Sequence, residues 1–300
     1  MRSPMLALLA AATIVPAASA HAQRADTAAT KIWLLAADRA LAAAVAERGV
    51  AALIEALAPD AAVLIPGEPI LRGAAAEGPL TARYGAPASL SFRALAAVAS
   101  ADPTFGCTVG VSTFTSAADT AHRERGGDYL ACWRRSSAGV PRLVGLQRGD
   151  GGPGSTPAPA DFDGGAMPRS STRTSDMRSL SEAQDADAAF AAAGGTSAGP
   201  GEAFAQWVAA DGLFPGERSG NRGATLMRAA FGSSPGGVML LWTPTRDLGD
   251  GAGGLAFTVG DAERKNATGA VLSRSKYFTV WRLDDDGRWR WIFDLGSARP

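Results

Sequence analysis

Two acidic residues lie on the apolar faces of expected helices, where a buried charge is costly, and this makes them candidate catalytic residues. Asp187 shares a stripe with Leu180, Ala183 and Phe190, and Asp38 shares one with Leu34, Leu41 and Val45. A carboxyl group among apolar neighbours has a raised pKa unless it is paired, and such a group suits general acid/base catalysis. The structural alternative pairs Asp187 with Arg222 and Asp38 with Arg72. Because both pairs recur, the sequence favours the structural alternative.

Asp294 is a further candidate, because it is an acid in an otherwise apolar final strand, within reach of the strand that carries Tyr277. The matching residue in the first half of the chain is Leu146 or Gln147, depending on a one-residue gap. The first half therefore lacks this acid. Two interpretations stay open, a catalytic or ligand-contacting Asp294 and a structural acid held by hydrogen bonds.

Other chemistries are disfavoured. The segment Gly195–Gly199 matches G-x-S-x-G, but it follows a helix and enters a turn, whereas the nucleophile motif needs a strand before it, a helix after it and a histidine base. One histidine, His122, remains after the expected signal peptide, and with two cysteines it leaves no zinc cluster. No glycine loop of the phosphate-binding kind opens a helix. We expect no metal and no cofactor.

Charge and the first residues bear on partners and location. The chain has 29 basic and 29 acidic residues, so no broad field favours nucleic acid or an anionic membrane surface. Arg2, the apolar run from Met5 to Val15 and the ending Ala20-His21-Ala22 predict a signal peptide at 1–22. No second apolar run has spanning length. We expect a periplasmic or secreted protein with no membrane attachment after cleavage.

The chain repeats itself on either side of a segment rich in Gly, Pro and Ser at 148–178, which predicts an interdomain linker. The matched landmarks are Pro66-Gly67-Glu68 with Pro215-Gly216-Glu217, Arg72-Gly73 with Arg222-Gly223, Cys107–Gly110 with Phe257–Gly260, Tyr129–Trp133 with Tyr277–Trp281, and Gly139 with Gly287. The interval from Gly73 to Gly110 and from Gly223 to Gly260 is 37 residues in both halves. The sequence therefore predicts a tandem duplication.

Each half has the periodicity of helices followed by strands. Helical stripes are followed by a segment around 224–231 and by strands near 238–248, 253–264, 271–283 and 288–295. A three-residue loop at 285–287 would pair Trp281 with Trp291 and Thr279 with Phe293. Both faces of this hairpin are substantially apolar. We expect one face to meet helices and the other to meet the sister half or another chain.

The duplication also bears on the cysteines. Cys107 matches Phe257 and Cys132 matches Val280. A hairpin turn at 266–269 places Phe257 opposite Val280, so Cys107 and Cys132 should face each other on neighbouring strands. In an exported protein we expect a disulfide there, the alternative being two buried thiols.

This order of motifs resembles the SnoaL-like members of the nuclear transport factor 2-like (ketosteroid isomerase-like) superfamily, over residues 31–147 and 180–296. The resemblance implies an α+β fold of two tandem cone-shaped domains, each with three N-terminal helices packed on a curved antiparallel sheet around a pocket. Enzymatic members of the superfamily use pocket carboxylates, often with Tyr or His, to move a proton next to a carbonyl. Other members only bind ligands or partners.

The functional expectation is an exported, non-catalytic module that binds a small apolar ligand or a protein partner. The expected ligand-binding residues lie in the second domain: Asp187, Trp207, Tyr277, Trp281, Trp291 and Asp294. The alternative is a general acid/base enzyme of isomerase or cyclase type that uses Asp294 or Asp187. The sheet faces are expected to form a domain–domain or homodimer contact.

Overall fold

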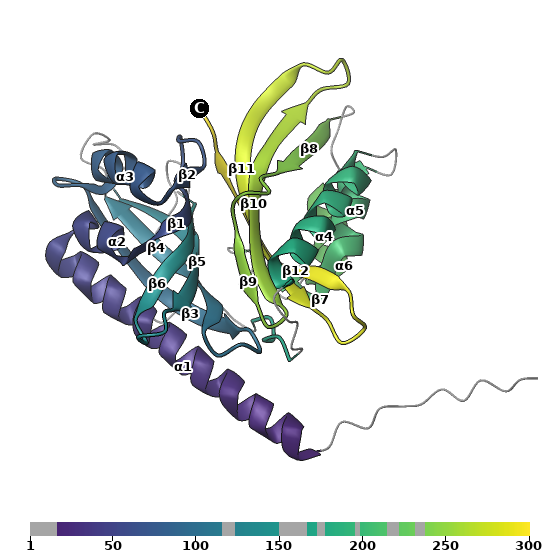
Figure 1. Cartoon of the computed structure of the whole chain (residues 1–300). Helices are drawn as coiled ribbons and strands as arrows, with labels where there is room; N and C mark the ends of the chain where they lie inside the picture. The colour runs from purple at the N-terminus through teal and green to yellow at the C-terminus, as the bar shows by residue number, and fades with distance from the viewer. Residues whose placement is uncertain are drawn as a thin grey trace, which may run out of the picture.

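The computed structural model describes residues 17–115, 124–149, 167–172, 178–195, 199–214, 222–231 and 238–300, with side chains described outside 17–26 and 229–231. These residues form two α+β domains whose sheets face each other (Figure 1). The expected fold class is confirmed.

The first domain begins with the long helix α1 and ends with strand β6. Its elements are α1 (Ala17–Arg48), α2 (Val50–Ala56), β1 (Leu57–Leu64), β2 (Leu71–Arg72), the 3-10 helix η1 (Gly73–Ala76), α3 (Glu77–Tyr84), β3 (Ser89–Ala99), β4 (Phe105–Thr115), β5 (Glu124–Arg135) and β6 (Pro141–Arg148). The strand order in its sheet is β2-β1-β6-β5-β4-β3.

The second domain repeats this plan. Its elements are α4 (Ser179–Gly194), α5 (Gly199–Trp207), β7 (Val208–Leu213), α6 (Gly223–Phe231), β8 (Met239–Pro244), β9 (Asp250–Ala252), β10 (Leu255–Lys265), β11 (Val271–Leu283) and β12 (Trp289–Ala298). The strand order is β7-β12-β11-β10-β8, with β9 paired to β10.

Neither sheet is purely antiparallel, which corrects one detail of the expectation. A strand follows the second helix of each domain and pairs in parallel with the last strand, β1 with β6 and β7 with β12. Each of these strands begins at the residue after a short helix, and no turn residues separate its apolar residues from those of the helix. The sequence analysis therefore did not predict these two strands.

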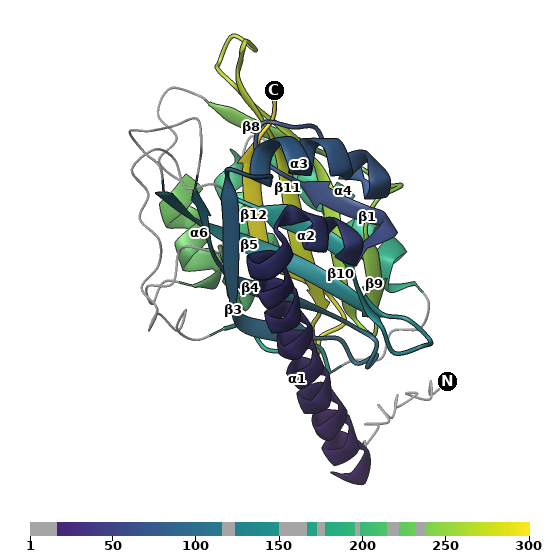
Figure 2. The same ribbon diagram turned by 90° about the vertical axis from the view of Figure 1, so that its left-hand side faces the viewer.

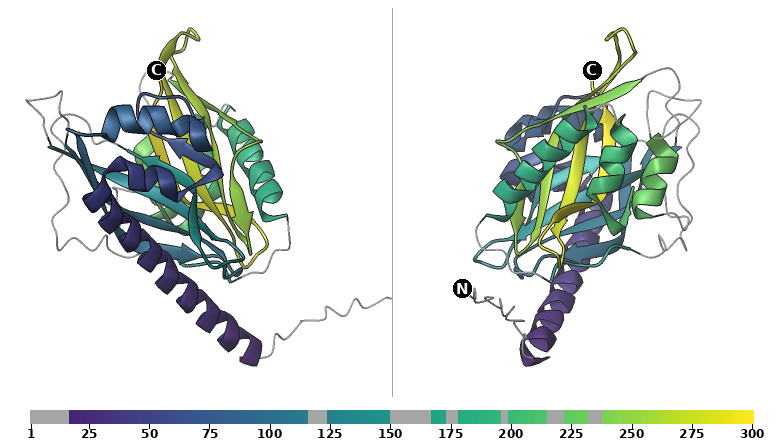
Figure 3. Two further views of the ribbon diagram at one scale, coloured as in Figure 1. Left: turned by 60° about the vertical axis from the view of Figure 1, so that its left-hand side comes forward. Right: turned by 90° about the vertical axis from the view of Figure 1, so that its right-hand side faces the viewer.

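The layers run helices, sheet, sheet, helices. Figure 2 shows α1, α2 and α3 over one face of the first sheet. The right-hand view of Figure 3 shows α4, α5 and α6 over the face of the second sheet that is turned away from the first domain. The remaining two sheet faces are turned toward each other. Among the described helices, none has both the length and the apolar character needed to cross a bilayer.

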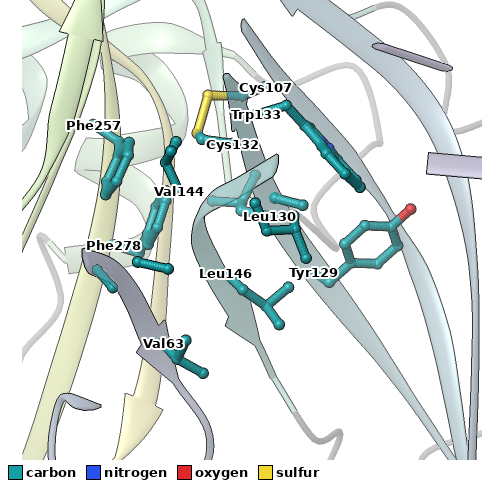
Figure 4. Packing of buried hydrophobic residues seen from close by; sticks show 14 of the residues in the cluster. Val63, Cys107, Tyr129, Leu130, Cys132, Trp133, Val144, Leu146, Phe257 and Phe278 are labelled. Atoms are coloured by element: carbon teal, nitrogen blue, oxygen red, sulfur yellow. A yellow bond between two sulfur atoms is a disulfide. The ribbon is translucent and has the colours of Figure 1, made fainter. Parts of the chain in front are cut away.

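An apolar core joins the two domains. Phe257 and Phe278, from β10 and β11, stack with ring centroids 4.6 Å apart and belong to one buried cluster with first-domain residues such as Val144 and Leu146 (Figure 4). Gly145 lies directly against these rings, and a Cβ added there would lie 2.7 Å from Phe257 Cζ. The expectation that the second sheet face meets the sister half is confirmed.

Polar contacts hold the same interface. The buried Lys276 donates from Nζ to the carbonyl oxygens of Ile65 (2.8 Å), Glu68 (2.7 Å) and Ala298 (2.9 Å). Arg134 of the first domain forms a bidentate ion pair with Asp250 of the second. The domains therefore share an apolar core, the contacts of a buried lysine and a partly buried ion pair.

The hairpin of β11 and β12 follows the predicted register only in part. Trp281 pairs with Trp291 as predicted, and Gly287 has a φ of 80° in the loop. A β-bulge follows, so Thr279 pairs with Asp294 and Val280 with Phe293. The predicted pairing of Thr279 with Phe293 is wrong, because the extra residue of a bulge reverses the faces of the residues beyond it. Asp294 consequently shares a face with Thr279 and Tyr277.

The cysteines behave as predicted. Cys107 on β4 pairs directly with Cys132 on β5, and the two sulfur atoms form a disulfide. The matching positions in the second domain, Phe257 and Val280, are also direct cross-strand partners.

The two ends of the predicted first domain fall differently in the structure. Residues 17–22 of the predicted signal peptide belong to α1, and residues 1–16 lie outside the described ranges. Arg148, placed at the start of the predicted linker, is the last residue of β6.

A part of the predicted linker is held against both domains. The nitrogen of Ser171 donates to Ala99 O, and the nitrogen of Arg169 donates to Asp211 Oδ2. The rest of the predicted linker at 150–166 and 173–177, together with His122, Thr196–Ala198 and Pro215–Glu217, lies outside the described residues.

Candidate functional site

Each domain buries one aspartate against a tyrosine and a threonine. In the first domain, Asp38 of α1 accepts from Tyr129 Oη (2.9 Å) and Thr108 Oγ1 (2.6 Å), and Trp133 Nε1 donates to Thr108 Oγ1 (3.1 Å). Asp38 has no exposed surface. The residues come from a helix and two neighbouring strands, so the network fixes α1 to the sheet.

The second domain contains the same network at the matched positions. Tyr277 Oη donates to Asp187 Oδ2 (3.0 Å), and Trp281 Nε1 donates to Thr258 Oγ1 (2.8 Å). Asp187 is also fully buried. Four residue types therefore recur at the positions that the sequence repeat aligns.

The expected arginine partners of these aspartates lie elsewhere. Arg72 donates to Asp247 Oδ2 of the second domain at 3.0 Å and is half exposed. Arg222 donates from Nη1 to Asp211 O at 3.5 Å. The predicted pairing of Asp38 with Arg72 is wrong, because Asp38 lies inside the domain, between its helix and sheet, whereas Arg72 lies at the domain boundary. The partners of Asp38 and Asp187 are hydroxyl groups.

An aromatic cavity of about 160 Å³ lies between the helices and the sheet of the second domain. Its apolar wall consists of Phe190, Phe204, Phe214, Leu240, Trp242 and Ala262, and its polar side of Ser275, Lys276, Tyr277, Thr279, Asp294 and Gly296. A dry apolar cavity of roughly 150 Å³ can hold benzene. The cavity therefore has room for a molecule about the size of benzene.

Asp294 brings a carboxyl group to this cavity. It pairs with Thr279 across β11 and β12, and Thr279 Oγ1 donates to Asp294 Oδ1 at 3.4 Å. In the first domain the same two positions carry Ala131 and Leu146, which are cross-strand partners and line the equivalent cavity. The structure thus resolves the one-residue gap: Leu146 is the counterpart of Asp294.

The two cavities differ most at the end of the last strand. Arg148 is opposite Tyr129 in the first domain, and Gly296 is opposite Tyr277 in the second. Arg148 is buried, donates from Nε to Ser112 Oγ (3.0 Å) and lies over the rings of Tyr84 and Phe114. The first cavity is reduced to about 20 Å³, enough for about one water molecule.

Two buried carboxyl groups of the second domain, Asp187 and Asp294, have raised pKa values. Burial raises the pKa of Asp294 to about 7, and the nearby Asp187 carboxyl adds to the rise. Burial likewise raises the pKa of Asp187 to about 7, against the lowering effect of the Thr258 and Tyr277 hydroxyls. In the first domain burial raises the pKa of Asp38 to about 6. Burial and the Asp187 charge raise the pKa of Tyr277, so this phenol stays protonated.

The six predicted ligand-binding residues occupy three kinds of place. Tyr277 and Asp294 line the cavity, and Asp187 lies behind Tyr277. Trp281 and Trp291 are fully buried and pack edge-on against Phe190 and Phe204, the rings of the cavity wall. Trp207 lines a separate open depression with Trp289, Arg288 and Arg290. Their roles in binding stay predictions.

Several lining residues were missed by sequence reasoning. Phe214, Leu240, Trp242 and Ala262 come from segments around β7, β8 and β10, and these residues are apolar and carry no group that suggests chemistry. Gly296 could have been found, since it matches Arg148 once the two final strands are aligned with the bulge included. Among the described residues, no group of three His, Cys, Asp or Glu side chains could hold a metal ion.

Comparisons with known proteins give structural neighbours only. No protein-family model matches the sequence, and no curated protein does. The chain is similar to the Δ5-3-ketosteroid isomerase of Mycobacterium sp., with 21% identity over 39% of this chain and 91% of that chain, at a TM-score of 0.31. A ketosteroid isomerase-like protein of Erwinia carotovora atroseptica has 17% identity over 39% and 93%, at 0.32. A Mycobacterium tuberculosis protein in complex with estradiol-17β-hemisuccinate has 14% identity over 38% and 91%, at 0.30.

Proposed function

We propose that the second domain is a binding module for a small, largely apolar molecule of about one ring, and that the first domain serves as its scaffold. The observation that carries the proposal is the contrast between the two cavities, about 160 Å³ in the second domain and about 20 Å³ in the first. Both domains pack three α-helices on a sheet and contain a buried aspartate bonded to a tyrosine, but only the second has the larger open space.

The walls of the cavity fit this role. Phe190 contacts Phe204 and Trp242 with ring centroids 4.8 Å and 4.6 Å apart, so the rings hold one another in place. Trp281 and Trp291 support them from the sheet side. A preformed apolar cavity with a few polar groups on one side is the usual form of a small-molecule site.

A cavity-filling variant tests the proposal. Ala262 lines the cavity from β10, so Ala262→Leu should fill part of it, whereas Ala138 stands in an exposed turn of the first domain and Ala138→Leu is the control. We expect phenol or benzyl alcohol to bind the wild-type chain and the control, and to bind Ala262→Leu at least about tenfold more weakly. Equal binding to all three proteins, measured by calorimetry, would place the ligand outside this cavity.

The second candidate function is general acid/base catalysis at the same cavity. It is favoured by Asp294, a cavity-lining carboxyl that is about half protonated near pH 7 and can both donate and accept a proton. A suitable test follows the exchange of the α-hydrogens of cyclohexanone with deuterated water by NMR. If the chain catalyses this proton transfer, Asp294→Asn should abolish the exchange while binding of the ketone persists.

We also propose that the chain is exported to the periplasm or secreted. The Cys107–Cys132 disulfide supports this location, because such bonds persist in oxidising compartments. The mass of the protein expressed in a bacterial host and recovered from its periplasm would test the predicted cleavage before Gln23. A homodimer is a further proposal that native mass measurement would check in the same sample.

A further inference from the structure

The first domain contains a cation inside its own aromatic cavity. The guanidinium carbon of Arg148 lies 5.5 Å from the ring centroids of both Tyr84 and Phe114. Its Nη1 donates to Tyr84 Oη at 3.4 Å and its Nε to Ser112 Oγ at 3.0 Å. The side chain is 3% exposed. The fold therefore accommodates a positive charge at this place when aromatic faces and hydroxyl groups surround it.

The second domain lacks this internal cation and has gained an acid. Gly296 stands where Arg148 stands, and Asp294 stands where Leu146 stands. Both replacements line the cavity. Taken together they remove a positive charge and add a carboxyl group, in a cavity whose wall includes the rings of Phe190, Phe204, Phe214 and Trp242.

Two cationic groups of the second domain are engaged elsewhere. Lys276 lines the cavity, but its ammonium group lies at the domain interface and donates to three backbone carbonyls. Arg246 is half exposed and pairs with Asp185 at 2.8 Å. Among the described residues that line the cavity, no cationic group is directed at Asp294. An ionised Asp294 is therefore stabilised best by a positive charge that arrives with the ligand.

We infer that the occupant of the second-domain cavity is an organic cation with an apolar methyl or methylene surface, about the size of tetramethylammonium. The aromatic faces would contact the methyl groups, and Asp294 would neutralise the charge. This inference rests on the proposed binding function and adds the chemical class of the ligand.

The test compares a cation with a neutral molecule of the same size. Tetramethylammonium and tert-butanol each have five heavy atoms, and their binding can be followed at pH 8 by NMR through the indole N–H of Trp242, a residue of the cavity wall. We expect tetramethylammonium to bind at least about tenfold more tightly than tert-butanol. In Asp294→Asn, which keeps the shape and removes the charge, this preference should disappear, because the affinity for tetramethylammonium falls.

The two levels of the proposal fail differently. If tert-butanol binds as tightly as the cation, or if Asp294→Asn leaves the preference intact, the ligand class is wrong and the binding function stands. If neither molecule, nor phenol, shifts the Trp242 signal, the binding function itself is wrong. Assignment of the Trp242 signal by Trp242→Phe makes either result interpretable.

The pH dependence gives an independent readout. Ionisation of Asp294 should strengthen cation binding between pH 6 and pH 8, whereas a ligand that accepts a hydrogen bond from the protonated acid would bind more weakly over the same range. The titratable and charged groups on neighbouring elements include Asp187 on α4, Lys276 and the neutral Tyr277 phenol on β11, Asp211 on β7 paired with Arg282, Glu202 on α5 paired with Arg228, and Asp261 on β10 paired with Arg299. Affinity for the cation that is flat or falls with pH would overturn the inference.

Discussion

Arg148 and Gly296 occupy equivalent positions on the last strands of the two sheets, each opposite a buried tyrosine. Arg148 fills its domain with its own side chain, and Gly296 leaves the corresponding space open. This one pair of aligned residues thus accounts for much of the difference in volume between the two cavities.

Gly296→Arg should close the second cavity. A Cβ at this position would meet nothing nearer than Lys276 O at 3.8 Å, and Gly296 is not among the glycines with positive φ, so an arginine fits without backbone strain. We expect binding of tetramethylammonium and of phenol to fall below detection, with the free energy of unfolding changed by less than about 1 kcal/mol. Calorimetry and urea titration measure the two quantities. Unimpaired binding would contradict the placement of the site.

The reciprocal change, Arg148→Gly, should open the first cavity and destabilise the chain. It removes two ring contacts and leaves the Ser112 and Tyr84 hydroxyls without these donors. We expect a loss of about 1–3 kcal/mol in the free energy of unfolding. The binding stoichiometry of phenol should rise from one to two per chain. A stoichiometry of one would show that the space collapses.

The raised pKa values of Asp187 and Asp294 predict how stability changes with pH. Each group has a folded pKa of about 7 and an ordinary value of 3.8, so between these values the folded chain binds more protons than the unfolded chain. The free energy of unfolding should therefore decline as pH rises from about 4 to about 7, by roughly 3 kcal/mol per group. Urea titrations across this range would measure the decline, and Asp294→Asn should make it smaller. If the free energy of unfolding rose over this range instead, burial would not be disfavouring the ionised form of these two acids.

The Cys107–Cys132 disulfide should contribute substantially to stability. It closes a loop with a sequence separation of 25 residues, for which the loss of unfolded-state entropy is worth about 3 kcal/mol. Replacing both cysteines with alanine should lower the free energy of unfolding by about this amount. Dithiothreitol should destabilise the wild-type chain and have no effect on the double variant, which is the control for non-specific reduction.

Gly145→Val should disrupt the domain interface. A Cβ there would lie 2.7–2.9 Å from ring atoms of Phe257 and Phe278, closer than packed side chains allow. We expect a loss of about 1–3 kcal/mol and faster proteolysis between the domains. The matched control is Gly149→Ala, because a Cβ there meets its nearest atoms at 3.7 Å. Similar behaviour of both variants would show that the interface tolerates the added volume.

Much of the fold could be predicted from the sequence because the same landmarks occur in both halves of the chain, so that each half helps to interpret the other. The aligned landmarks fixed the pairing of Cys107 with Cys132, and the hairpin loop fixed Trp281 opposite Trp291. The strands β1 and β7 were missed because each follows a helix without a turn signal.

The candidate site was predicted less completely, for two physical reasons. The bulge before Phe293 could not be read from alternation, although it decides which face Asp294 occupies. The partners of Asp38 and Asp187 are hydroxyl groups on strands, whereas charge pairing had pointed to arginines. Both errors concern tertiary contacts that a local pattern does not encode.

The face-to-face packing of the two sheets has a genetic consequence. In a homodimer that packs in this way, one gene encodes both subunits, so every substitution occurs in both. An arginine that fills the cavity of one subunit then also fills the cavity of the other. Joining the halves in one chain removes that constraint. One half can then keep a filled cavity while the other keeps an open one, and the two are made in equal numbers because they share one chain.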